Sequence, residues 1–160
     1  MTVSARLRIV NAANWLVDHR DECRYSEDSP ERTSCIRRPY EVPFVSDCSS
    51  GVAALFYWGG AHDPNDLGFG GDPYTGTLVE RGRLISASSA RSADVGILGP
   101  DTGWHAVLVL SAGPAPLVWS MGEEGDPRIY RMSVVEQGVA YVNHVESCQV
   151  RYFRFNTAKR

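Results

Sequence analysis

The chain has 160 residues, of which 43% are hydrophobic and 22% are charged. This length suits one folded domain with its own core, and we take residues 1–160 as a single domain. The net charge of −3 at neutral pH argues against nucleic acid as the main partner, because phosphate binding needs a basic surface. No apolar run approaches the roughly 18–20 residues of a membrane span, so we expect no insertion into a membrane.

The beginning of the chain lacks the uninterrupted apolar stretch of a secretory signal. We therefore expect synthesis in a cytoplasm, with reduced cysteine thiols rather than disulfides. His19, Cys23 and Cys35 are of the residue types that bind zinc, but a fourth ligand is missing. The sequence therefore predicts no metal ion and no cofactor.

Two helices are expected in the first part of the chain. Residues 4–18 place apolar side chains at helical spacing behind Ser4, which can cap the helix. Residues 20–45 are polar and contain three prolines, which predicts a long irregular connection. The stretch "SDCSSGVAALFYWGG" predicts a second helix, with Ser46 or Asp47 as its cap and two glycines at its end. Because this helix is largely apolar, we expect it in the centre of the fold.

The later part of the chain changes from a helical to an extended pattern. Residues 61–76 predict a loop, and "TLVERG" predicts a short helix that ends at Gly82. Helices followed by strands predict an α+β fold, in which N-terminal helices pack on an antiparallel meander of about five to six strands. Short apolar runs between turn signals predict strands at 94–98, 105–110, 116–120, 128–134, 139–145 and 149–155.

Cys48 lies at the predicted N-terminus of the central helix. Unpaired N–H groups and the helix dipole stabilise an anion there, which predicts a thiol pKa below the ordinary value of about 8.5. A thiolate in this position could act as a nucleophile. The alternative is a buried and inert thiol, which is the commonest state of a protein cysteine.

A thiol nucleophile needs a base beside it, and His105 is the best placed of the four histidines. It opens the apolar strand "HAVLVL", and a histidine at the mouth of a strand can reach the N-terminus of a helix packed on the sheet. His19, His62 and His144 are expected to be surface or core residues.

The motifs that surround these residues resemble a known family. "DCSSGVAALFYW", "ADVGILG" and "HAVLVL" resemble the motifs of NlpC-type papain-like cysteine peptidases. "GAHDPNDLGFGG", "YTGTL" and "PLVWSMGEEG" are similar to the peptidase domains of actinobacteriophage endolysins. The resemblance implies a papain-like fold with Cys48 as nucleophile, His105 as base and Tyr25 in the wall of the substrate groove. Asp94 matches an aspartate of the family, although Ala93 replaces the usual glycine before it.

The sequence departs from the family at the residue that orients the base. The family often uses a second histidine, but Met121 stands at the corresponding place, and methionine cannot orient an imidazole. If the strands of residues 105–110 and 116–121 form a hairpin, Ser120 shares a face with His105 and could accept a hydrogen bond from its Nδ1–H.

Other residues could orient the base instead of Ser120. Glu123 or Glu124 could turn toward the imidazole, because both follow the same strand. A Cys–His pair could also act without a third residue, or the activity could be weak or lost.

The resemblance implies an amide bond of the peptidoglycan stem peptide as substrate. The bond would be either γ-D-glutamyl-diaminopimelate or the muramoyl-alanine amide. We expect the substrate to contact residues near the nucleophile and in the aromatic walls of the groove. These substrate-binding candidates are Tyr25, Asp47, Ser49, Tyr74 and Trp104.

We expect a monomer that stays in the host cytoplasm until it is released to the cell wall, or that is carried in the virion. One alternative is a weakened or inactive binding component of the virion on the same fold. Another alternative is a toxin-type amidase or acyltransferase that acts on protein.

Overall fold

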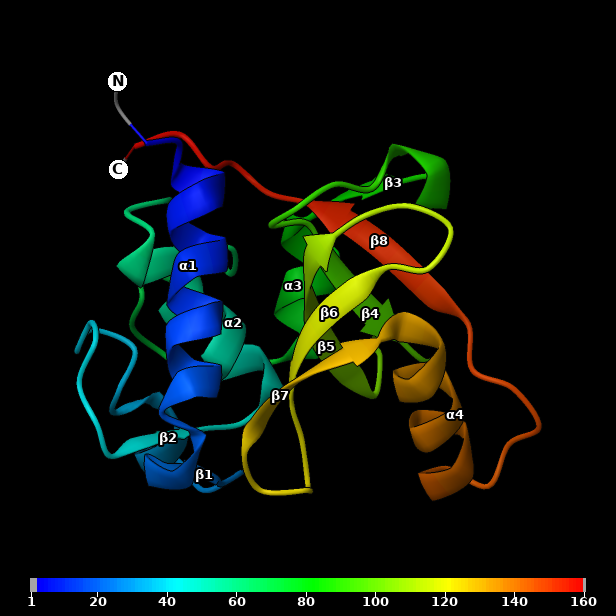
Figure 1. Cartoon of the computed structure of the whole chain (residues 1–160), viewed down its shortest axis with the longest axis horizontal. Coiled ribbons are helices and arrows are strands. Elements are labelled where there is room, and N and C mark those ends of the chain that lie inside the picture. Colours follow the sequence, from blue (N-terminus) through cyan, green and yellow to red (C-terminus); the bar gives the residue numbers. More distant parts are fainter. Residues whose placement is uncertain (1–2, 160) are drawn as a thin grey trace.

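The first part of the chain forms the two helices expected there, in a computed structural model that describes residues 3–159 (Figure 1). Helix α1 spans Ala5–Asp18, and the Ser4 hydroxyl caps it by accepting from the backbone N–H of Leu7 at 3.2 Å. Helix α2 spans Cys48–Trp58 and nearly all its residues are buried, which confirms its central place. The short helix α3, Thr75–Arg81, ends before Gly82 as predicted.

The connection between α1 and α2 is less irregular than the prolines suggest. It contains two short strands that pair in parallel and were not predicted, because each has only three residues. These strands bring Tyr25 next to Ser46, directly before the cap of α2. The elements of this segment are the short 3-10 helix η1 (Arg20–Glu22), strand β1 (Cys23–Tyr25), the short 3-10 helix η2 (Glu31–Thr33) and strand β2 (Phe44–Ser46).

The main sheet has six strands in the order β3-β8-β4-β5-β6-β7, and all of its pairs are antiparallel. The four strands β4 to β7 form the predicted meander. Strand β8 returns across the molecule and inserts between β4 and β3, so the meander does not extend to the end of the chain. The strands are β3 (Arg83–Ile85), β4 (Val95–Leu98), β5 (His105–Ser111), β6 (Leu117–Met121), β7 (Pro127–Arg131) and β8 (Val150–Arg154), with a short 3-10 helix η3 (Ala87–Ser89) after β3.

The prediction of a strand at 139–145 is wrong, and the strand predicted at 128–134 ends early. Residues Met132–Val142 form helix α4 instead. The valines of this segment favour strands, but Met132, Val135 and Ala140 recur at helical spacing and are buried against the sheet. Packing of that face therefore outweighs the strand preference.

The two faces of the sheet carry different helices, with α1 and α2 on one side and α4 on the other (Figure 1). Side chains of β5 alternate between these faces. Ala106 and Leu108 join the core that includes α1 and α2, whereas Val107 and Val109 join the core that includes α4. No helix within residues 3–159 is long and apolar enough to cross a membrane.

Candidate active site

The N-terminus of α2 is fixed by a capping box around Asp47. The Asp47 carboxylate accepts from the backbone N–H and the hydroxyl of Ser50, both at 2.7 Å, and the Ser50 hydroxyl accepts from the Asp47 N–H at 3.0 Å. The Ser49 hydroxyl also donates to the carboxylate, at 3.0 Å. These contacts set the first turn of the helix, where Cys48 lies.

The Cys48 thiol is neutral at neutral pH, which contradicts the predicted low pKa. Burial, followed by the charge of Asp47, raises the pKa of Cys48 to about 12. The backbone N–H groups of Ala106, Ser49 and Cys48 itself point to the sulfur and oppose this shift, but they do not offset it. A thiol at a helix N-terminus is therefore not acidic here, because its residue is only 8% exposed.

His105 is the first residue of β5, and its imidazole pairs with β6. Its Nε2 atom lies 2.8 Å from the Ser120 hydroxyl oxygen. The strand register explains the contact. Val107 pairs with Ser120 across the hairpin, and His105 lies two residues before Val107, so the side chains of His105 and Ser120 are on the same face. Ser120 as the partner of His105 is confirmed, but the nitrogen is Nε2 rather than the predicted Nδ1. Nδ1 is therefore the ring nitrogen that Ser120 leaves free for another partner.

The imidazole is also neutral at neutral pH. Burial lowers the pKa of His105 to about 4, and the charge of Asp47 opposes this shift. Cys48 and His105 thus form a neutral thiol and a neutral imidazole in the resting state. A neutral imidazole can accept a proton, as a general base must.

Several contacts place Cys48, His105 and Tyr25 in one neighbourhood. The N–H that approaches the Cys48 sulfur from β5 belongs to Ala106, the residue after His105. The charge of Asp47 acts on both groups. Burial raises the pKa of Tyr25, and so do its hydrogen bond to Glu27 and, once it is ionised, the nearby Cys48.

A cavity of about 390 Å³ opens beside His105 and Ser120. Tyr25 and Trp104 also line it, so four of the predicted site residues meet in one space. The remaining walls come from the loop between β6 and β7, from β7 and from α4. The wall formed by α4 could not be predicted, because the sequence indicated strands there.

The other predicted substrate-binding residues lie outside this lining. Asp47 and Ser49 are held in the capping contacts, and Ser49 is only 1% exposed. Tyr74 is exposed directly before α3, and its ring lies over Gly76. Contact of these three residues with a substrate stays a prediction.

Met121 cannot take the place of the orienting histidine. It is fully buried in the core with α2, because side chains alternate along β6 and Ser120 faces the other way. The carboxylates of Glu123 and Glu124 make no hydrogen bond with His105 in the described part of the chain. Ser120 is therefore the side chain that hydrogen-bonds to the imidazole among the described residues, and its role in orienting the base stays a prediction.

Arg32 is a buried residue that the sequence did not reveal. Its Nη1 donates to the Asp47 carboxylate at 2.7 Å and to the carbonyl oxygen of Pro73 at 2.7 Å, while Nη2 pairs with Asp72. The arginine is 6% exposed and ties the cap of α2 to the loop before α3. A polar, proline-containing segment gives no local signal of such long-range pairing.

No group of three or more His, Cys, Asp or Glu side chains within residues 3–159 could hold a metal ion. The four cysteines are unpaired, as expected. The arrangement that the described residues do form is an imidazole and a hydroxyl in the wall of a cavity, with the buried Cys48 thiol outside that lining and next to the N–H of Ala106.

No model of a known protein family matches the chain, and no curated protein matches it either. The resemblance to NlpC-type peptidases therefore rests on the sequence motifs.

Proposed function

We propose that the chain is a cysteine peptidase or amidase of papain-like NlpC type, which cuts an amide bond in the peptidoglycan stem peptide as phage endolysins do. The observation that carries the proposal is the pairing of His105 with Ser120 at 2.8 Å in the wall of a cavity, on the strand whose next N–H approaches the Cys48 sulfur. The α+β architecture, with Cys48 at the start of a central helix, supports it as well.

In the proposed reaction, Cys48 is the nucleophile and His105 the base. The thiol pKa of about 12 lies far above the imidazole pKa of about 4, so the resting pair is neutral, and in the proposed step the proton passes to Nδ1 of His105 only as the sulfur attacks the amide carbonyl carbon. Backbone N–H groups at the start of α2 stabilise the oxyanion. The tetrahedral intermediate expels the amine, which takes the proton from the imidazolium. Water then hydrolyses the thioester and restores the thiol.

Asp47 and Ser120 assist the base in this scheme. The Ser120 hydroxyl accepts a hydrogen bond from Nε2–H, which leaves Nδ1 unprotonated and able to take the thiol proton. The charge of Asp47 raises the pKa of His105 and so favours the imidazolium that forms during attack.

A second candidate function is a binding component that keeps the fold without catalysis. Two observations favour it: the Cys48 thiol is buried with a raised pKa, and Met121 occupies the place of the orienting residue. The stem peptide would then be a ligand rather than a substrate.

Digestion of purified cell wall by wild type and three variants tests the proposal. Wild type should release fragments whose masses identify the cut bond, whereas Cys48→Ala and His105→Ala should release none. Cys35→Ala is a matched control, because Cys35 is also a buried free cysteine but contacts the backbone of Pro43 and Val45 rather than that of β5. Equal products from all four proteins would overturn the enzyme proposal. Binding of wall by wild type without products would favour the second candidate.

A further inference from the structure

The cavity beside His105 has one acidic wall and one apolar wall. The loop after β6 and the segment after β1 contribute three carboxylates, from Glu27, Glu123 and Glu124. No lysine or arginine is among the residues that line it. The imidazole is neutral because burial lowers the pKa of His105, so the lining carries only negative charge at neutral pH.

Two of the three carboxylates make no hydrogen bond or ion pair within residues 3–159, although the charge of Glu124 acts on Arg128. The Tyr25 hydroxyl donates to Glu27 at 2.7 Å, but Glu123 and Glu124 form no ion pair with any described residue. The nearby cation, Arg128, is held by Asp126 at 2.6 Å. Two exposed carboxylates at the rim of the cavity are therefore available to a ligand.

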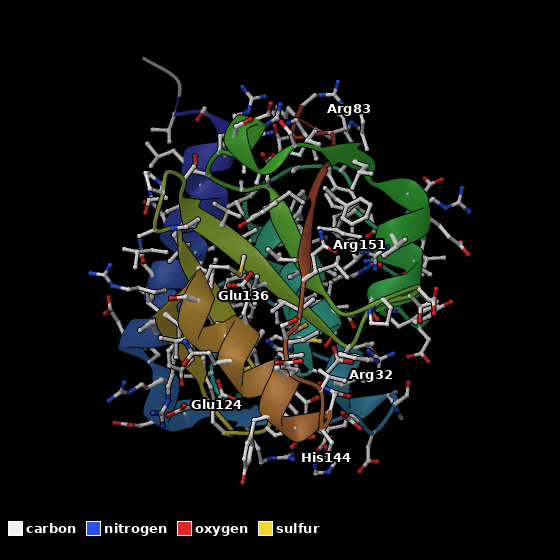
Figure 2. All side chains as sticks on the ribbon, turned by 90° about the vertical axis from the view of Figure 1, so that its right-hand side faces the viewer. Arg32, Arg83, Glu124, Glu136, His144 and Arg151 are labelled. Carbon is white, nitrogen blue, oxygen red and sulfur yellow. The ribbon has the colours of Figure 1, made fainter. Side chains whose placement is uncertain are left out.

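The loop that carries these carboxylates is anchored. The Tyr25 N–H donates to the carbonyl oxygen of Gly125 at 2.9 Å, and the Gly125 N–H donates to that of Gly122 at 2.9 Å. Figure 2 looks onto α4, with Glu124 in the lower part of the view beside this helix. Glu123 and Glu124 line the same cavity as residues of this helix.

The α4 wall is apolar and leaves space. Val134, Val139 and Val142 line the cavity from this helix. Gly138 lies among them, and a Cβ atom built on it would meet nothing within 4 Å. A glycine inside a helix costs stability, and no close contact requires one here. The position is therefore free for the aliphatic part of a ligand.

We propose that this cavity is a subsite for an aliphatic chain that ends in a protonated amine, with the ammonium group at Glu123 and Glu124 and the chain along α4 beside Gly138. The proposal rests on the proposed function in taking the stem peptide as the ligand. An ammonium group forms charge-assisted hydrogen bonds with unpaired carboxylates, and its methylene groups pack on valine side chains. A ligand arm whose only charged group is a carboxylate would be repelled from the same cavity.

Binding to the Cys48→Ala protein tests the subsite without turnover. Soluble stem peptides with free side-chain amines are titrated by calorimetry, and the same peptides are titrated after acetylation of the amines. Acetylation removes the charge and keeps the chain, so it should weaken binding about tenfold. Adding Glu123→Gln and Glu124→Gln should abolish the difference in affinity between the free and the acetylated peptides. Adding Gly138→Leu should weaken the binding of both peptides, because the leucine side chain fills the cavity.

The control carries Glu80→Gln and Glu146→Gln, which change the net charge equally at exposed residues outside the cavity and should keep the difference. Equal affinity for free and acetylated peptides, or no binding of either, would overturn the subsite. Preference for the free amine in the Cys48→Ala protein, together with no wall digestion by wild type, would overturn the enzyme proposal and leave the subsite standing.

Discussion

Asp94 and Asp47 are both aspartates whose carboxylates accept hydrogen bonds from arginine, but their surroundings differ. Asp94 is fully buried and accepts from Arg154 at 2.7 and 3.0 Å and from Arg6 at 3.1 Å. Burial opposes its ionisation, yet the arginines and the backbone N–H of Arg91 hold the pKa of Asp94 below its ordinary value. This pairing joins α1 and β8, the two ends of the described chain.

Asp47 is held by Arg32 but acts on other groups. Its charge raises the pKa of the Cys48 thiol and opposes the lowering of the pKa of His105. Asp94 is not among the groups that shift either pKa. Similar arginine–carboxylate pairs therefore have different roles. The Asp94 pairs hold α1 and β8 together, whereas the Asp47 pair lies at the start of α2, where its charge acts on the candidate site.

The largest effect is expected from Asp94→Asn. It leaves the positive charges of Arg6 and Arg154 without their carboxylate, so the free energy of unfolding should fall by about 3–5 kcal/mol. Urea unfolding measures this loss. Asp21→Asn, at an exposed site, is the control and should change stability by less than about 0.5 kcal/mol. A loss below about 1 kcal/mol would show that the Asp94 pairs contribute little to stability. Lower activity per folded molecule would show that Asp94 also affects the candidate site.

The next effect is a loss of stability in mild acid that comes from His105. The folded pKa of about 4 lies below the unfolded value of 6.5, so the unfolded chain binds a proton first as the pH falls. Stability should therefore be full above about pH 6.5 and fall by about 2–3 kcal/mol by pH 4. Asp94 has a lowered pKa, so its contribution is lost only below its unfolded value of 3.8.

Urea unfolding at intervals between pH 7 and pH 4 separates these two windows. His105→Gln should flatten the curve in this range, and His62→Gln, at an exposed histidine, should leave it unchanged. A curve of His105→Gln that matches wild type would show that His105 is not kept neutral by burial.

The sequence predicts those parts of the site that depend on local spacing. Asp47 as a helix cap and the pairing of Ser120 with His105 follow from turn length and alternation of side chains, which neighbouring residues determine. The core helix α2 follows from its apolar composition and flanking glycines.

The remaining parts depend on contacts between distant segments. Arg32 contacts Asp47 and Asp72 only after the chain has folded, and no spacing of residues in the sequence predicts these ion pairs. The pKa of Cys48 depends on how tightly α2 packs on β5, which decides burial and reverses the expected direction. Helix α4 is set by the sheet face that it covers rather than by the strand preference of its valines.

A smaller effect is expected from Asp47→Asn, which keeps an oxygen for the helix cap and removes the charge. Stability should fall by about 1–2 kcal/mol, because Arg32 keeps its contacts with Asp72 and Pro73. Since Asp47 raises the pKa of Cys48, its removal should lower that pKa and speed alkylation of the thiol above pH 8.

Mass analysis of iodoacetamide-treated protein measures the modification of Cys48 apart from the other cysteines. Asp21→Asn is the control, since it removes an exposed carboxylate whose charge does not act on the thiol and should leave stability nearly unchanged. Equal rates in Asp47→Asn and wild type would contradict the coupling between the cap and the candidate site.

The smallest effect is expected from Arg32→Lys, which keeps the charge and loses the planar fork. Arg32 is 6% exposed and reaches three acceptors, so one ammonium group cannot satisfy all of them, and stability should fall by about 1 kcal/mol. Arg24→Lys is the control, because Arg24 pairs with Glu31 at the surface and should change stability by less than about 0.5 kcal/mol. Urea unfolding compares the two variants. Equal losses would mean that the buried contacts of Arg32 stabilise the protein no more than a surface ion pair does. The position of Asp47 would then depend on the helix cap alone.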